Sequence, residues 1–171
     1  YYTMNETESI TCNDSSGNSI DGEYFGDPNL YLSGLLNPAI GSAVEFDGID
    51  DYIEVPDSNV LDLRRQVSFT FWLKVNSFKN TWTPLVHKAS TYDSPTRTYS
   101  MFLHNTGYLY LSSADASGQE VYNTPAGTIV PGNWYHIAGI IDRDFGQLST
   151  YVNGELKASG SIRTTDTVSN S

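Results

Sequence analysis

The stretch AVEFDGIDDYIEVP, Ala43–Pro56, carries the strongest local pattern in the chain, because apolar and polar residues alternate on both sides of a central turn. Asp47-Gly48 starts that turn, and such a pair tolerates the positive φ angles of a tight turn. Asp50 and Asp51 add side chains that can accept hydrogen bonds from nearby backbone amides. The pattern predicts a strand, a turn and a second strand, with the two strands paired as a β-hairpin.

Two longer segments downstream of this stretch are predicted to be central strands. In VSFTFWLKV, Val67–Val75, five apolar residues fall on one face, and WYHIAGIID, Trp134–Asp142, is similarly apolar. Asn153-Gly154 favours a primed turn, so the residues on either side of it should pair as a hairpin. Residues Tyr1–Ser9 are expected to form a short opening strand, and Leu30–Pro38 an irregular connection.

The whole chain predicts an all-β protein. No stretch keeps a helical period over three turns, and short strands separated by Gly, Asn and Pro are typical of an antiparallel sandwich or barrel. With 171 residues and 39% hydrophobic content, one domain with a sizeable core is expected over residues 1–171. These residues leave the choice between sandwich and barrel open.

Charge and apolar runs exclude several classes of partner. The formal net charge of −11 repels phosphate backbones, so neither nucleic acid nor an anionic membrane is an expected partner. No apolar run is long enough to insert in a membrane, and the single Cys12 excludes an intramolecular disulfide. An acidic chain with many Asn and Gly residues suits an extracellular or surface-displayed protein, on a cell or a virion.

Five separated segments, in order, carry a resemblance to a known family: FDGIDDYIEVPDS, Leu61-Asp62-Leu63, VSFTFWLKV, GNWYHIAGIID and LSTYVNGEL. Together they resemble the laminin-G-like jelly rolls of the concanavalin A-like lectin and glucanase superfamily, over about Asn13 to Gly160. The resemblance implies an antiparallel two-sheet jelly-roll sandwich. Because this fold carries lectins, adhesion modules, structural domains and glycosidases, it leaves the function open.

The resemblance breaks near the end of the sequence. After KASGSI, Lys157–Ile162, family members continue with a segment like PLxIG and a closing strand like GxIDEVRIY, and this sequence runs instead to TTDTVSNS. We therefore expect the remaining C-terminal strands in a longer chain, of which these residues are a fragment, or in a neighbouring subunit that completes the sheet.

A calcium site is predicted in the loop NDSSGNSIDGEY. Asp14, Asn18 and Asp21 lie close in sequence around two glycines, and their oxygens are the ligands that Ca²⁺ prefers. The loop also resembles the one that binds calcium in many family members. The alternative is a cluster of Asx turns, in which the same side chains bond to backbone amides. Asp142 and Asp144 form a second, weaker acidic group.

A ligand site is predicted around two aromatic residues, because exposed rings stack on sugars while nearby polar groups bind hydroxyls. Trp82 and Tyr92 are expected in loops. The polar candidates beside them are Asn80, Asp93 and Arg97. Tyr108, Tyr110 and Tyr122 are candidates to line a sheet face, although tyrosine is also ordinary strand composition.

Catalysis is not expected. Glu45, Asp47 and Asp50 superficially resemble the carboxylate triplet of retaining glucanases, but Gly48 interrupts the strand on which both carboxylates would have to lie. The three histidines stand alone, without a carboxylate or cysteine at ligand spacing. A turn whose Asp side chains cap backbone amides explains the triplet better.

The sequence thus predicts a non-catalytic surface module that binds a glycan or a protein partner and holds a structural calcium. The first alternative is an assembly domain of a virion or surface filament, completed by a neighbouring chain. The second is a glycoside hydrolase of the same superfold.

Overall fold

The computed structural model describes residues 1–35, 42–90 and 96–168, and it divides into two compact units, Tyr1–Ser58 and Asn59–Ser171. The structure includes a 3-10 turn, η1 (Asn59–Leu61), and none of the helices in the described part of the chain has the length and apolar character of a membrane span. The predicted all-β class is confirmed.

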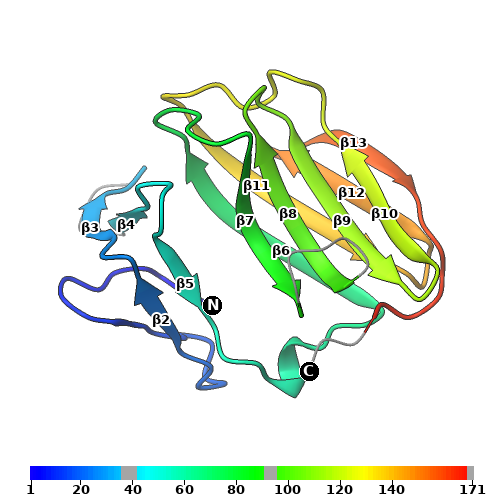
Figure 1. Cartoon of the computed structure of the whole chain (residues 1–171), viewed down its shortest axis with the longest axis horizontal. Coiled ribbons are helices and arrows are strands. Elements are labelled where there is room, and N and C mark those ends of the chain that lie inside the picture. Colours follow the sequence, from blue (N-terminus) through cyan, green and yellow to red (C-terminus); the bar gives the residue numbers. More distant parts are fainter. Residues whose placement is uncertain (36–41, 91–95, 169–171) are drawn as a thin grey trace. The chain divides into compact units, whose positions relative to one another are not determined.

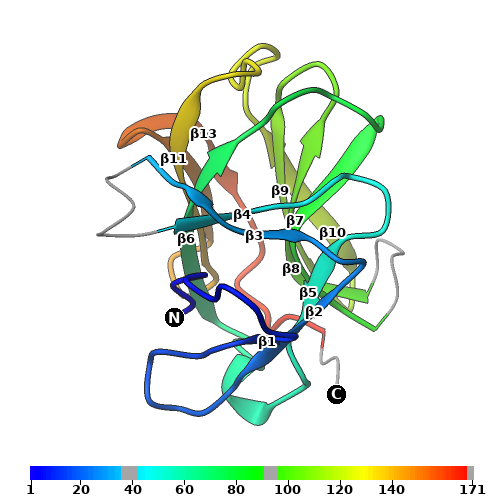
Figure 2. The ribbon, with the colours of Figure 1, turned by 90° about the vertical axis from the view of Figure 1, so that its left-hand side faces the viewer.

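The first unit contains two small antiparallel sheets (Figure 2). One has three strands, β1 (Thr11–Cys12), β2 (Gly22–Phe25) and β5 (Tyr52–Glu54), and the other has two, β3 (Asn29–Ser33) and β4 (Ser42–Glu45). The predicted opening strand at residues 1–9 is wrong, because this segment makes a single bridge, between Tyr2 and Asp14. The predicted irregular connection after Leu30 begins instead with strand β3.

The predicted hairpin over Ala43–Pro56 is also wrong, since β4 pairs with β3 and β5 pairs with β2. The turn between them is capped by its own acidic side chains: Asp51 Oδ2 accepts the Asp47 N–H at 2.6 Å and Asp47 Oδ1 accepts the Ile49 N–H at 2.7 Å. These amides are therefore satisfied within the turn and need no ladder partner. The predicted amide-capping role of the Asp side chains is confirmed.

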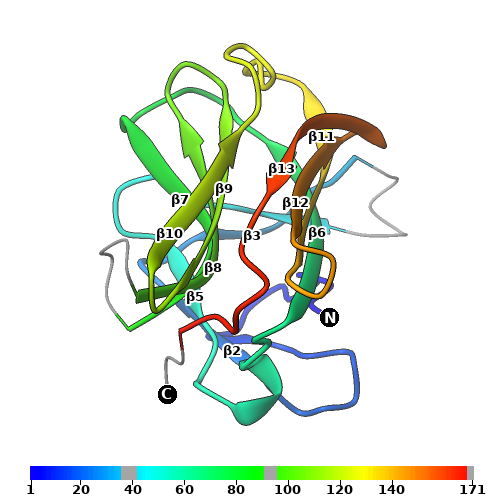
Figure 3. The same ribbon diagram turned by 90° about the vertical axis from the view of Figure 1, so that its right-hand side faces the viewer.

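The second unit is a sandwich of two four-stranded antiparallel sheets, packed face to face (Figures 1 and 3). The front sheet runs in the order β7 (Trp82–Ala89), β8 (Arg97–His104), β9 (Leu109–Asp115) and β10 (Gly118–Asn123). The back sheet runs in the order β6 (Gln66–Lys74), β11 (Trp134–Asp142), β12 (Gln147–Val152) and β13 (Glu155–Ser161). A sandwich, and not a barrel, is the architecture of this unit.

The hydrophobic core lies between these two sheets, and it uses the alternation predicted for β6. Phe69 and Phe71 pack against buried residues that include Met101 of the front sheet and Ile137 of β11. Gly139 pairs with Phe69, and a Cβ at this glycine would lie 2.6 Å from the Phe69 ring, so only glycine fits there. The inward faces of the strands are thereby fixed, and so are the outward faces.

The predicted hairpin at Asn153-Gly154 is confirmed, because Tyr151 pairs with Leu156 and Val152 with Glu155. Both turn residues have positive φ, 52° for Asn153 and 79° for Gly154. This is the conformation that matches the right-handed twist of the flanking strands.

A buried ionic cluster closes one end of the sandwich. Arg143, in the turn after β11, has no exposed surface, and its Nη1 lies 3.3 Å from Glu120 Oε2 on β10. Its Nη2 donates to Ser113 Oγ on β9 at 2.9 Å, and Nη1 donates to the carbonyl oxygens of Arg163 and Thr165. One side chain, from the turn after a back-sheet strand, therefore bonds to two strands of the front sheet and to the segment after β13.

Residues 162–168, the red segment in Figure 3, leave the back sheet and end beside the front sheet. Arg163 Nε donates to Asp115 Oδ2 at 2.7 Å, and its Nη2 donates to the Gly118 carbonyl oxygen at 2.6 Å. The Thr165 hydroxyl also donates to Asp115, and the Val168 N–H donates to the Ala114 carbonyl oxygen at 3.0 Å. Two arginines and two carboxylates balance within this cluster.

Arg143→Met should lower the free energy of unfolding by about 3–5 kcal/mol, because it removes one of the two arginines that balance the buried carboxylates of Asp115 and Glu120 and breaks the bonds that Arg143 makes to Ser113, Arg163 and Thr165. The matched control is Lys157→Gln, which removes an ion pair to the exposed Glu155 and should cost about 0–1 kcal/mol. Urea unfolding at neutral pH measures both. A loss below about 1 kcal/mol for Arg143→Met would show that the cluster does not hold the sheets together.

Acid should destabilise the sandwich through Asp115. The Arg163 guanidinium holds the pKa of the Asp115 carboxyl well below its usual range. Below about pH 4 the unfolded carboxyl binds a proton that the folded one does not, so the stability that it contributes is present above that pH and is lost as the pH falls. Asp115→Asn should therefore give a flatter decline of the unfolding free energy from pH 5 to pH 2 than the parent chain. Parallel curves for the two proteins would contradict this role.

Candidate functional site

The outer face of the front sheet carries a cluster of aromatic side chains, on the side of the strands opposite the core. Because Met101 and Leu103 of β8 point inward, Phe102 and His104 point outward. The same alternation on β9 directs Leu109 and Leu111 inward. The outward cluster, called the aromatic face from here on, consists of Trp82, Phe102, His104, Tyr108 and Tyr110.

Trp82 is at the centre of this face. It is the first residue of β7 and pairs across the ladder with His104. Its ring centroid lies 4.7 Å from that of His104, 5.7 Å from that of Tyr108 and 5.2 Å from that of Tyr110, in edge-on arrangements. Because three rings hold it in place, Trp82 is a rigid group, and 42% of its surface is still exposed.

His104 is held in one orientation by its neighbours. The Thr106 N–H donates to His104 Nδ1 at 3.2 Å, and the Thr106 hydroxyl lies 2.8 Å from the same atom. Since Nδ1 accepts, the neutral ring carries its hydrogen on Nε2. The ring is stacked on Tyr108, with centroids 4.5 Å apart and an interplanar angle of 13°. His104 thus supplies a fixed Nε2–H donor beside Trp82.

Arg97 lies at the other end of the aromatic face. Its Cζ is 4.7 Å from the centroid of Phe102, whose ring is 6.2 Å from Tyr110. Burial raises the pKa of the Tyr110 hydroxyl, whereas the charge of Arg97 acts in the opposite direction. A continuous row of rings therefore leads from Trp82 to a cation.

The structure brings together two of the predicted ligand-binding residues, Trp82 and Arg97, on one face. Asn80 precedes β7 and is exposed, while Tyr92 and Asp93 lie outside the described residues. The prediction that Trp82 lies in a loop is wrong, because Trp82 begins a strand and faces His104. That pairing follows from the ladder between β7 and β8, which no local pattern reveals.

The strand tyrosines divide between the two faces. Tyr108 and Tyr110 contact Trp82 on the outer face of the sheet, as predicted for residues that line a sheet face. Tyr122 instead points inward, where its hydroxyl donates to the Ser161 carbonyl oxygen at 2.8 Å. A Cβ at Gly160 would overlap the Tyr122 ring, so the glycine makes room for it.

Sequence reasoning missed His104, although its alternation with Phe102 was a usable signal.

The predicted calcium loop is arranged as an Asx-turn cluster. The Asp14 side chain is only 3% exposed, and its two oxygens accept from the Ser16 N–H and hydroxyl and from the Ile20 N–H. Asp21 Oδ1 accepts the Asp14 N–H at 2.8 Å, and Asn18 Nδ2 donates to Ser16 Oγ. These bonds, with that from the Ser16 hydroxyl foremost, hold the pKa of Asp14 well below its usual range. In this arrangement the carboxylates do not fit a cation, because backbone donors already occupy them.

Two further acidic groups serve the backbone in the same way. Asp142 Oδ1 accepts the N–H groups of Asp144 and Phe145, and Asp144 pairs with Arg65 at 2.6 Å. Asp47, Asp50 and Asp51 have carboxylate oxygens within 4.8 Å of one another, on a single turn. Two of these three already cap amides there, which does not favour the catalytic alternative.

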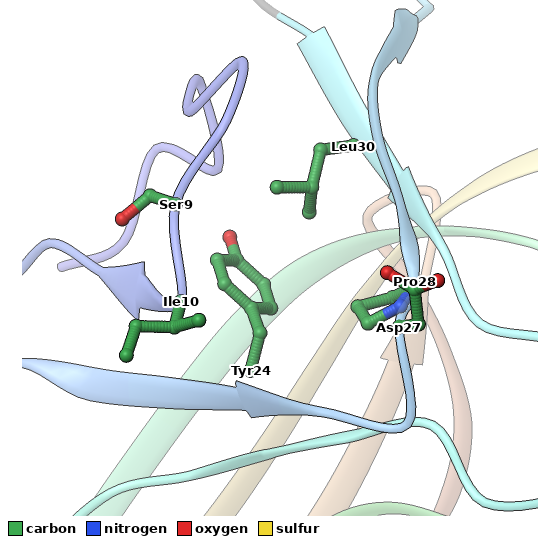
Figure 4. A pocket seen from close by; sticks show the side chains of 6 residues that line it. All are labelled: Ser9, Ile10, Tyr24, Asp27, Pro28 and Leu30. Carbon is green, nitrogen blue, oxygen red and sulfur yellow. The ribbon is translucent and has the colours of Figure 1, made fainter.

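The first unit has a small pocket of its own (Figure 4), with a volume of about 190 Å³. The Tyr24 ring forms one wall, and the Tyr24 hydroxyl donates to Glu6 Oε2 at 3.0 Å. The other lining residues are Ser9, Ile10, Asp27, Pro28 and Leu30. Its volume is below the range of about 300–1,000 Å³ that is usual for small-molecule sites, so the aromatic face is the stronger candidate.

The two face-to-face antiparallel sheets, with binding groups on an outer face, define a sandwich module of the jelly-roll class. The sequence profile of a laminin-G-like family, described as "Concanavalin A-like lectin/glucanases superfamily", matches residues 47–171, and the chain belongs to this family. No curated protein matches the chain.

Among the similar solved structures is one titled "Binding domain of Botulinum Neurotoxin DC in complex with SialylT". The two share 13% sequence identity with a TM-score of 0.62, over 95% of this chain and 39% of that chain. At this identity the similarity shows the fold alone. The chain spans well under half of that protein's length.

Calcium binding at the Asp14 loop stays a prediction, and it requires the ion to replace the Ser16 and Ile20 donors. If calcium binds there, the melting temperature should be higher in calcium than in chelator, because an ion that binds only the folded state stabilises it. Asp14→Asn should then abolish the difference, while its single amide oxygen can still accept the Ser16 N–H. Equal melting of the parent chain in calcium and in chelator would contradict calcium binding.

Proposed function

We propose that this chain is a non-catalytic extracellular or surface-displayed module that recognises glycans through its aromatic face. The observation that carries the proposal is the rigid and partly exposed Trp82, held between His104, Tyr108 and Tyr110. Sugar rings present C–H groups that pack on aromatic surfaces, and a ring fixed in advance loses little conformational entropy on binding.

Polar groups on the aromatic face would orient a bound sugar. The Nε2–H of His104 is a donor for a sugar hydroxyl, since its Nδ1 is engaged by Thr106. The hydroxyls of Tyr108 and Tyr110 both donate and accept. A ligand site usually consists of an apolar surface with a small number of polar groups around it. The likeness to a binding domain solved in complex with a sialylated ligand is consistent with this function.

The outer face of the front sheet can recognise a ligand without a deep cleft. The front sheet is fixed from below by the core and at one end by Arg143, so the outward rings hold their spacing without a ligand. Side chains that are already ordered lose little conformational entropy on binding, so more of the contact energy appears as affinity. A protein partner that inserts an extended or aromatic segment on the same rings is the alternative ligand.

An assembly role is a second candidate, favoured by the edges of the sandwich. Within the described residues, the nine-residue strand β6 pairs with β11 alone, and β7 pairs with β8 alone. Unpaired edges are templates for another strand. A neighbouring subunit that supplies a strand would complete the sheet. An oligomer whose size in light scattering rises with protein concentration would support this assembly role.

Trp82→Ala should weaken binding to any recognised glycan at least tenfold, because the stacking surface is lost. The probe is a panel of immobilised neutral and acidic glycans, followed by titration calorimetry on those that bind. Trp72→Ala is the matched control: this tryptophan is 53% exposed on the outer face of the other sheet, where its ring packs on His136, and its removal should leave the affinity unchanged.

Unfolding curves of both variants show whether a loss of binding reflects a loss of fold. Binding that survives Trp82→Ala, or that Trp72→Ala removes equally, would contradict the proposed site. Absence of binding to every glycan of the panel would contradict the glycan function.

A further inference from the structure

The exposed part of the aromatic face lies at one end of the front sheet. Trp82 is the first residue of β7 and is 42% exposed. His104 is the last residue of β8, and Tyr108 immediately precedes β9, so both stand beside the turn that joins these two strands. The rings that a ligand can reach are therefore gathered at the strand ends and are not spread along the sheet.

The outer face becomes buried along the strands away from this end. Phe102, the next outward residue of β8, is only 6% exposed; Arg97 lies over its ring at 4.7 Å, and His87 packs edge-on against it at 5.4 Å. The outward residues that follow, Ser100 on β8 and Ser112 on β9, are fully buried, and their hydroxyls bond to each other at 2.7 Å. A ligand at the open end of the face therefore has no further contact surface in this direction.

The face is also narrow across the strands. On one side, β7 is the edge strand of this sheet among the described residues. On the other side, Tyr110 pairs with the exposed Asn123 of β10, and the ring of the neighbouring Tyr122 points inward. Of the outward aromatic side chains that the structure describes on the front sheet, Trp82 alone is exposed, whereas Tyr108 and Tyr110 are half-buried.

The polar groups of the site surround this one ring. The ring centroids of His104, Tyr108 and Tyr110 all lie within 5.7 Å of that of Trp82. The His104 Nε2–H is thus a donor directly beside the stacking surface. One sugar ring stacked on Trp82 reaches all of these groups, whereas the next unit of a chain would extend into solvent or over the buried part of the sheet.

We infer that the aromatic face is a site for a single sugar unit, so its ligands are glycans recognised by one residue and not by a stretch of polysaccharide chain. This inference rests on the proposed function, since it assigns a ligand class to the same site. Strong attachment to a surface then depends on several copies of the module that bind several copies of the sugar.

The test compares oligosaccharides of one to six units of glucose, galactose, mannose and N-acetylglucosamine by titration calorimetry. A chain of identical units offers one binding place per unit, so the affinity per chain should rise by no more than about sixfold from one unit to six. A site with further subsites would gain at least about tenfold within the first three units, because each added sugar makes new contacts. Trp82→Ala should weaken the binding of all lengths by the same factor.

A second ring on β7 should extend the site. Pro84 is exposed, and it lies two residues after Trp82 on the same side of the strand, about 7 Å further along. Pro84→Tyr should therefore raise the affinity for three-unit chains at least about fivefold and leave that for the single sugar unchanged, because the new ring stacks on a neighbouring unit. Pro84→Ser is the matched control, since it removes the proline in the same way without adding a ring.

The outcomes separate the two proposals. A rise of more than about tenfold from one unit to three in the parent chain, with binding lost in Trp82→Ala, would overturn the inference and keep the glycan function. Absence of binding to every series would overturn the proposed function and the inference with it. Equal affinities of Pro84→Tyr and Pro84→Ser for three-unit chains, in variants with normal melting, would contradict the boundary of the site that the inference requires.

Discussion

The buried guanidinium of Arg143 is the constraint on which the rest of the sandwich depends. A charge without solvent is tolerated only when partners surround it, and here the carboxylates of Glu120 and Asp115, the Ser113 hydroxyl and two carbonyl oxygens do so. Such a cluster is poor evidence for net stability, because desolvation offsets much of the attraction. We infer that its role here is to specify the arrangement of the strands, since every partner has to be in place at once.

This constraint reaches the aromatic face through the alternation of the strands. On β9, Ser113 and Asp115 point inward to the arginines, whereas Tyr110 points outward. On β10, Glu120 points inward and Gln119 lies on the opposite side. A shift of either strand by one residue would exchange these faces, so the ions that join the sheets also fix which side chains are presented to a ligand. Fold and site are therefore specified by the same register.

Local pattern predicted most of the second unit and less of the first. The apolar alternation of Val67–Val75 and the Asn153-Gly154 turn each depend on neighbours in sequence, and both are confirmed. The Ala43–Pro56 hairpin failed because its two strands have better partners elsewhere, which a local pattern cannot show. The role of Arg143 was not foreseen either, because in sequence it lies within an acidic loop and its partners are 20 or more residues away.

The candidate site shows the same division. Trp82 and Arg97 could be chosen from sequence because aromatic and basic residues near loops suit sugar ligands. Their placement on one face, with His104 and Tyr110 between or beside them, follows from the ladders of β7, β8 and β9. Family membership supports the sandwich, whereas the choice of this face depends on the ring geometry.

The most direct test of this account is a map of the ligand contact by NMR. The backbone amide and Trp side-chain signals of the labelled chain would be followed while the glycan that binds best in the panel is added. The account predicts that the largest shifts belong to Trp82, His104, Tyr108 and Tyr110. Shifts concentrated around Trp72 and His136 on the back sheet, or around the small pocket at Tyr24, with none on the aromatic face, would contradict it.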